Sequence, residues 1–139
     1  MYKKILIASD GSEGAAKAFA TALESARQHN AELTMICVEE LPNLPTSVDE
    51  VVENKRDLNG LFNRVTKHAR AQAKGAQVKF DTHIVAGRVV PSIIEYIEHK
   101  GFDLLIVGFM GHTALYNRII GSTTNRLVNL APCSVLVIK

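Results

Sequence analysis

A chain of 139 residues, 47% hydrophobic and 22% charged, has the composition of an ordinary globular protein, which excludes a disordered or fibrous class. Its 16 basic and 14 acidic residues leave a formal net charge of +2, which gives no reason to expect a nucleic-acid or anionic-membrane surface. The length suits one domain over residues 1–139. Because residues 1–5 lead straight into a strand-like segment, without a signal peptide, and no apolar run reaches membrane-spanning length, we expect a cytoplasmic protein.

The first half of the chain predicts a β-α-β unit. Residues 3–8 (KKILIA) and 33–38 (LTMICV) are almost continuously apolar, as in strands buried within a parallel sheet. Five residues between them fall at helical spacing: Ala16, Phe19, Ala20, Leu23 and Ala26. Residues 39–60 open with acids and prolines and show no clear period before their end, so we expect a loop there.

The second half continues the alternation of helices and strands. A helical stripe formed by Leu61, Phe62, Val65 and Ala69 predicts a helix that ends near Gly75. Apolar and polar side chains then alternate over residues 78–84, which is typical of a strand at a sheet edge. The remaining expected elements are a helix with Pro91 first and Gly101 just past its end, a strand at 103–107, a helix at 123–130 and a strand at 134–138.

Strands that alternate with helices predict one doubly wound α/β sheet with right-handed crossovers. In such a sheet, ligands collect at the carboxyl ends of the strands, where the winding direction reverses. Gly108 and Asp10 both follow predicted strands directly, so both are expected at this edge.

The residues after the fourth predicted strand have a spacing that suits an anion. Gly108 and Gly111 bracket a turn, and Gly121 comes ten positions later, before Ser122 and Thr123 at the start of a helix. Glycines allow close approach to the backbone, and the first amides of a helix attract phosphate. The alternative is an ordinary strand-to-helix connection in which Ser122 is the N-cap residue.

Asp10 is the second candidate for ligand contact. Its carboxylate could accept hydrogen bonds from ribose hydroxyls or help to hold a divalent cation beside phosphates. The alternative is helix capping, because Asp10 and Glu13 have the spacing of a capping box.

Two well-known phosphate-binding patterns are absent from the sequence. Without GxxxxGK[ST], the lysine that serves phosphoryl transfer in P-loop enzymes is missing, and without GxGxxG after the first strand a dinucleotide oxidoreductase is disfavoured. Cys37 and Cys133 lie far apart without CxxC spacing, so we expect buried free thiols.

Four segments together carry a resemblance to a known family: KKILIASDGSEGA, AGRVVPSIIEYI, DLLIVG and APCSVLVIK. Over its whole length the chain resembles the universal stress proteins, specifically the branch with the G-x2-G-x9-G-[ST] nucleotide motif. The resemblance implies a Rossmann-like domain with a five-stranded parallel sheet in the order 3-2-1-4-5. It also implies ATP binding at the carboxyl edge and a homodimer in which the last strands pair.

The same resemblance implies roles for individual residues. Asp10 would meet the ribose, or a magnesium or manganese ion held through the nucleotide, and the backbone of Val38 would read the adenine edge of ATP, ADP or AMP. The residues that would hold the sugar and the phosphates are Gly108, Gly111, Gly121, Ser122 and Thr123. Phe109 and Met110 depart from the family pattern. The family often has a small polar residue at the first of these positions and a basic or polar residue at the second. We therefore expect the backbone to carry the nucleotide.

The last predicted strand is apolar on both faces, with Val135, Leu136, Val137 and Ile138 in succession. In the implied strand order it is an edge, and an exposed apolar edge invites pairing with a second chain. We expect a homodimer through residues 134–138, with burial beneath the protein's own helices as the alternative.

These observations favour an ATP-binding stress-response regulator or binding module in which hydrolysis is slow or absent, because no general base or activating lysine is recognisable. One alternative is a slow ATPase or self-phosphorylating enzyme, in which Asp10 places a metal and Ser122 or Thr123 lies near the terminal phosphate. Another is a nucleotide-free interaction protein of the same fold.

Overall fold

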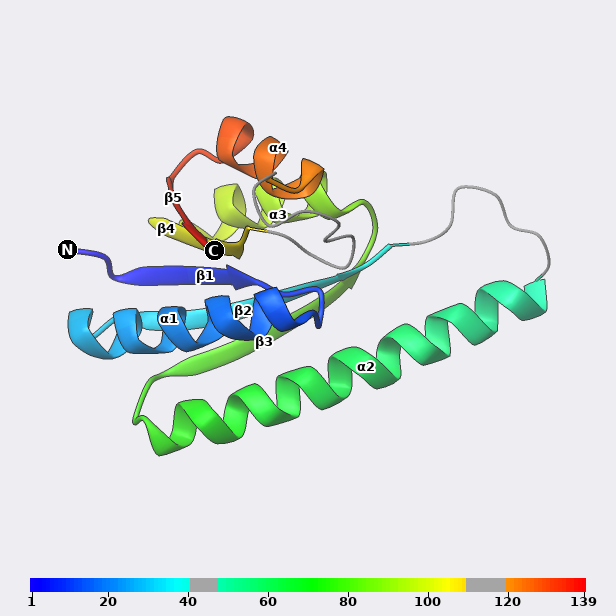
Figure 1. The fold of residues 1–139 in the computed structure, drawn as a ribbon, viewed down its shortest axis with the longest axis horizontal. Helices are drawn as coiled ribbons and strands as arrows, with labels where there is room; N and C mark the ends of the chain where they lie inside the picture. The colour runs from blue at the N-terminus through cyan, green and yellow to red at the C-terminus, as the bar shows by residue number, and fades with distance from the viewer. Residues whose placement is uncertain (41–47, 110–119) are drawn as a thin grey trace.

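The computed structural model describes residues 1–40, 48–109 and 120–139, the side chains of 48–59 excepted. Its five parallel strands form one sheet in the order β3-β2-β1-β4-β5, so the predicted fold class is confirmed (Figure 1). The strands are β1 (Lys4–Ala8), β2 (Glu32–Glu39), β3 (Phe80–Ala86), β4 (Leu104–Gly108) and β5 (Ser134–Ile138).

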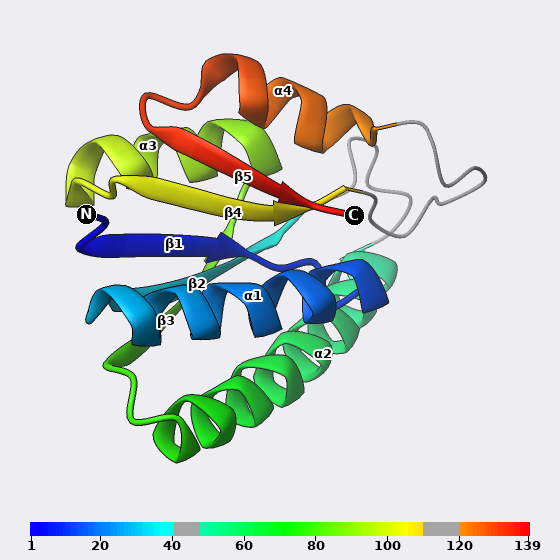
Figure 2. The same ribbon diagram turned by 60° about the vertical axis from the view of Figure 1, so that its left-hand side comes forward.

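Four helices cover the two faces of the sheet. They are α1 (Glu13–His29), α2 (Val48–Gly75), α3 (Val89–Lys100) and α4 (Ser122–Leu130). α1 and α2 pack on one face and α3 and α4 on the other, around two separate apolar clusters (Figure 2). No helix in the described part of the chain is long and apolar enough to cross a membrane.

The sequence pattern follows the position of each strand in the sheet. Ile5, Leu6 and Ile7 of central β1 are 0% exposed, because helices cover both faces of a central parallel strand. The edge strands β3 and β5 contain no fully buried residue. Leu136 of β5 is 39% exposed, so the protein's own helices do not fully cover this strand.

The start of α2 corrects the expectation of a loop over residues 39–60. The helix begins at Val48 and runs past the carboxyl edge of the sheet (Figure 1). Val48, Val51, Val52 and Leu58 fall at helical spacing and continue the stripe of Leu61, Phe62 and Val65 toward the N-terminus. The expectation of a loop relied on the acids and prolines at the start of this segment and therefore missed this part of the helix.

Two further corrections concern the registers of helices. α3 begins at Val89, so Pro91 is its third residue, still within the first turn, where its missing amide has no intrahelical partner to lose. In α1, Ala15, Ala18 and Ala22 are buried, whereas two of the alanines predicted to be buried, Ala16 and Ala20, are exposed. Apolar spacing alone could not show which face of α1 is buried, because alanines lie on both the buried and the exposed face.

The two cysteines are free, and Cys37 is 0% exposed. Burial, together with the nearby carboxylates of Asp10 and Glu39, raises the pKa of the Cys37 thiol from its ordinary 9.0 to about 12. Glu39 is itself only 4% exposed, and its Oε1 has no hydrogen-bond partner in the part of the chain described. Cys133 is only half-buried, which differs from the expectation of two buried thiols.

We therefore expect a disulfide reagent at pH 8 to label one thiol of the native protein, Cys133, and to reach Cys37 only after denaturant is added. Because folding holds the Cys37 proton more tightly, its contribution to stability is complete below pH 9 and is lost as the pH rises toward about 12. Thiol titration of the wild type and of Cys133→Ser measures this. Rapid labelling of native Cys133→Ser would contradict the burial of Cys37.

Candidate functional site

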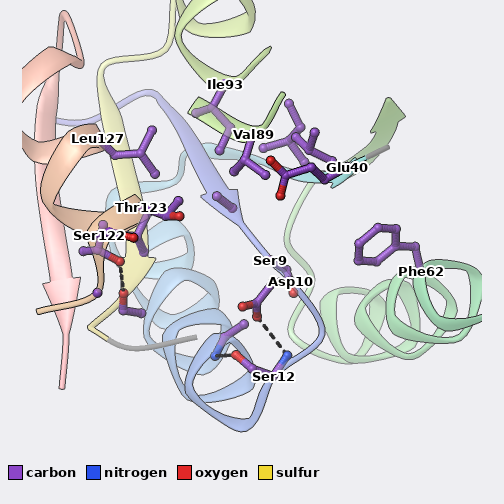
Figure 3. Close-up of a pocket in the computed structure, with 18 of the residues that line it drawn as sticks. Ser9, Asp10, Ser12, Glu40, Phe62, Val89, Ile93, Ser122, Thr123 and Leu127 are labelled. Carbon is purple, nitrogen blue, oxygen red and sulfur yellow. Dashed lines mark hydrogen bonds between the residues drawn. The ribbon is translucent and has the colours of Figure 1, made fainter. Parts of the chain in front are cut away.

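A cavity of about 420 Å³ lies at the carboxyl edge of the sheet, between the ends of β1, β2 and β4 and the start of α4 (Figure 3). Six of the seven residues predicted for the site line it: Asp10, Val38, Gly108, Gly121, Ser122 and Thr123. The seventh, Gly111, lies outside the described residues.

Asp10 is held at the cavity by a tight turn between β1 and α1. Its Oδ1 accepts a hydrogen bond from the Ser12 amide at 2.9 Å, and Gly11 has a φ of +79°, a conformation that favours glycine. Ser12 is the N-cap residue of α1, because its Oγ accepts a hydrogen bond from the Ala15 amide at 3.1 Å (Figure 3). The capping alternative for Asp10 is therefore wrong.

The start of α4 has the form of an anion site. Its N-cap residue is Gly121 rather than Ser122, and among the described residues no side chain caps the first turn. Gly121 has an ordinary extended conformation, with φ −61° and ψ 149°, so the backbone does not need a glycine there. Its missing side chain matters instead, since the first helical amides stay uncapped. They carry the positive end of the helix dipole into the cavity beside exposed Ser122 and Thr123.

Two hydrogen bonds connect α4 to the end of β4, and a third connects the residue after β4 to β5. The buried Thr124 Oγ1 donates to the Gly108 carbonyl at 2.8 Å, and the Gly121 amide donates to the Phe109 carbonyl at 3.0 Å. The Phe109 amide donates in turn to the Ile138 carbonyl at 2.8 Å. Both backbone groups of Phe109 are thus engaged within the protein, and the expected backbone cradle does not include them. Met110, like Gly111, lies outside the described residues.

Thr124→Val should lower the free energy of unfolding by about 1–3 kcal/mol, because it leaves the Gly108 carbonyl without its hydroxyl donor while keeping the side-chain volume. Thr124→Ser keeps the donor and should lose less. Urea denaturation of the three proteins measures the difference. Equal stability of the valine variant and the wild type would show that this hydrogen bond does not hold α4.

Gly108 packs tightly against the first turn of α1. A Cβ atom at this position would lie 3.1 Å from both the carbonyl carbon and the oxygen of Gly14, in the first turn of α1. The sequence predicted that ligand packing demanded this glycine. The structure adds a second reason for a small residue at Gly108, the close approach of the α1 backbone.

The end of β2 presents backbone groups to the cavity. The Ser9 amide donates to the Ile36 carbonyl, and the Gly87 amide donates to the Glu39 carbonyl, each at 3.0 Å. Backbone groups of successive strand residues point to opposite neighbours, so those of Val38 point as Ile36 does, toward the β1 side. The pairing of β1 with β2 ends at Ala8 and Ile36, and Val38 lines the cavity, so we infer that its amide and carbonyl face the cavity.

Several lining residues were not predicted from the sequence. They include Glu40, Leu61, Phe62, Val89 and Ile93, together with Thr124. Leu61, Phe62 and Ile93 were recognised only as helix stripes, and no local signal places a helix stripe beside a distant strand end. Only Thr124 had a usable signal, a third hydroxyl in the first turn of α4.

The charged residues among the described lining are Asp10 and Glu40, and no lysine, arginine or histidine is included. Within residues 1–40, 48–109 and 120–139, no group of three or more His, Cys, Asp or Glu side chains gathers to hold a metal. In the described part of the lining, partial positive charge therefore comes from the first backbone amides of α4.

Comparisons with known proteins agree with this architecture. A family model described as the Universal stress protein family matches residues 1–139. YxiE of Bacillus subtilis is 28% identical across the full length of both chains, and MJ0531 of Methanocaldococcus jannaschii is 31% identical across all of this chain and 83% of its own. The structure of UspA from Lactobacillus plantarum gives a TM-score of 0.84 at 26% identity, over 99% of this chain and 98% of that one.

Two solved structures of the same fold contain nucleotides. A universal stress protein in complex with cAMP matches with a TM-score of 0.76 at 22% identity, over 99% of this chain and 97% of that one. An Arabidopsis thaliana family member with AMP bound matches with a TM-score of 0.69 at 18% identity, over 99% and 91% of the two chains. At these identities the similarity establishes the shared fold.

Proposed function

Because this chain belongs to the universal stress protein family, we propose that it binds ATP with Mg²⁺ or Mn²⁺ and acts as a nucleotide-dependent stress-response regulator or binding module. Hydrolysis in this proposal is slow or absent. The described cavity lining supports this view, because it has uncapped amides that suit phosphate and no lysine to activate it.

The order of three groups along the sheet edge carries the proposal. Val38 lies near the end of β2, Asp10 follows β1, and the first turn of α4 lies beside β4, with β1 between β2 and β4 in the sheet. Neighbouring strands are about 4.8 Å apart, so the two ends of this row are separated by roughly 10 Å. A base, a ribose and a phosphate follow one another over a comparable distance. Family members of this fold with cAMP or AMP bound support the same assignment.

A metal ion fits this site only through the nucleotide. Asp10 supplies one carboxylate, and its Oδ1 already accepts the Ser12 amide. When bound, Mg²⁺ or Mn²⁺ would neutralise phosphate charge, and phosphate oxygens and water would provide most of its ligands.

Identifying the nucleotide that the purified protein releases on denaturation tests the proposal most directly. We expect an adenine nucleotide, detected by mass, and heat of binding when stripped protein is titrated with ATP and magnesium. If the stripped, folded protein gives no heat and the purified protein releases no nucleotide, the proposed function is wrong.

The proposal includes a homodimer that pairs through residues 134–138. β5 is the edge of the sheet, and Leu136 is 39% exposed, while Val128 and Leu130 of α4 are 43% and 54% exposed. An apolar edge strand is commonly protected by pairing with another chain.

We expect a sedimentation mass of twice 15.2 kDa for the wild type and a shift toward 15.2 kDa for Leu136→Lys, since a lysine at the paired edge would be buried without a partner. Gln72→Lys adds the same charge at an exposed site on α2, away from β5 and α4, and should remain dimeric. A wild type that sediments as a monomer at micromolar concentration would contradict the homodimer.

A further inference from the structure

Glu40 brings a second carboxylate into the cavity, at the β2 end and away from α4. It follows Val38 by two positions in an extended segment, so the two side chains point to the same side. Figure 3 shows the Glu40 carboxylate beside Val89 and turned into the cavity, with Thr123 on the far side of the opening. The carboxylate therefore lies where the proposed nucleotide would place its base.

The surroundings of Glu40 suit a flat ring with polar groups on its edge. Val38, Val89 and Phe62 supply apolar surface at this end of the cavity. The Val38 backbone supplies one hydrogen-bond donor and one acceptor. Phosphates are disfavoured here because Glu40 and Asp10 would repel them, so the phosphates of a nucleotide are directed to the first turn of α4.

The chemistry of a carboxylate makes this end selective. An ionised carboxylate only accepts hydrogen bonds. It can accept from an amino group on the ring edge, whereas an oxo group at the same place would turn its lone pairs toward the carboxylate with no hydrogen between them.

We propose that Glu40 is a specificity-determining residue that favours 6-aminopurine over 6-oxopurine nucleotides by accepting a hydrogen bond from the amino group. This inference rests on the proposed function, since it concerns the base of the proposed ligand. The Val38 backbone contributes to the preference for 6-aminopurines and is unchanged by side-chain substitution. The contribution of Glu40 can be removed by substituting its side chain.

Calorimetric titrations of the wild type and Glu40→Gln with ATP and with inosine triphosphate, each with magnesium, test the inference. We expect the wild type to bind ATP about a hundredfold more tightly than inosine triphosphate. A glutamine amide can rotate to donate to the 6-oxo group, so the ratio should fall about tenfold in Glu40→Gln, mainly through tighter binding of inosine triphosphate. Glu95→Gln removes the same charge from an exposed site on α3 outside the cavity and should keep the wild-type ratio.

Different outcomes would overturn the role of Glu40 and the proposed ATP binding. A fall in the ratio for Glu40→Gln and not for Glu95→Gln supports the role of Glu40. If all three proteins bind ATP and have the same ratio of affinities for ATP and inosine triphosphate, the inference is overturned and the proposed function stands. If the folded wild type binds neither nucleotide, both are overturned.

Discussion

Thr123→Glu should weaken ATP binding by about a hundredfold or more while leaving the fold intact. Thr123 is exposed in the first turn of α4 and lines the cavity, so a glutamate fits without disturbing the core. An acidic side chain near a helix N-terminus stabilises the helix by about 0.3–1 kcal/mol. The same carboxylate would occupy the positive end of the dipole and repel the phosphates, a like-charge contact that costs several kcal/mol.

Calorimetric titration with ATP and magnesium, alongside thermal unfolding, measures both effects. Asn125→Glu provides the matched control, because it adds the same charge to an exposed position of α4 that does not line the cavity. The control should bind ATP within a few-fold of the wild type. Wild-type affinity in Thr123→Glu would place the phosphates elsewhere.

Gly108→Val should destabilise the protein by about 3 kcal/mol and weaken ATP binding as well. Its Cβ would lie 3.1 Å from two backbone atoms of Gly14, and a backbone cannot rotate away as a side chain can. Either β4 or the first turn of α1 must therefore move, with the cost expected of overpacking a close-packed interior. The movement would also displace the Gly108 carbonyl, which accepts the hydrogen bond from Thr124.

Gly75→Val makes the same chemical change where a Cβ atom meets nothing within 4 Å. We expect its free energy of unfolding to stay within about 0.5 kcal/mol of the wild type, as for most surface substitutions. Urea denaturation of both variants gives the comparison. A Gly108→Val protein as stable as Gly75→Val would mean that α1 and β4 can separate at little cost.

The sheet could be predicted because its strands obey local rules. The strand predicted at 134–138 matches β5 at both ends, and the apolar runs before Ala8 and Gly108 reflect burial on two faces. The loop predicted before Gly60 is wrong from Val48 on, because the sparse helical stripe of Val48, Val51, Val52 and Leu58 was missed behind the acids and prolines that open the segment.

The candidate site could be predicted where its residues adjoin strand ends. Asp10 and Gly121 carry local signals, a turn after a strand and a glycine before hydroxyls. Other roles became clear only from the structure. Ser12 rather than Asp10 caps α1, and Gly108 packs closely against the backbone of α1. Phe62 reaches the cavity from a helix distant in sequence, and packing of that kind leaves no local pattern.

The hydrogen bond between the Gly121 amide and the Phe109 carbonyl, 3.0 Å long, ties together the two ends of the chain segment between them. A flexible insert between these fixed ends would cost little, since each doubling of the length of a flexible segment adds only about 0.6 kcal/mol of closure entropy. Peptide tags or reporter sequences inserted between residues 109 and 121 should therefore leave the sheet and α4 in place. This makes the segment a suitable point at which to attach a probe next to the candidate site.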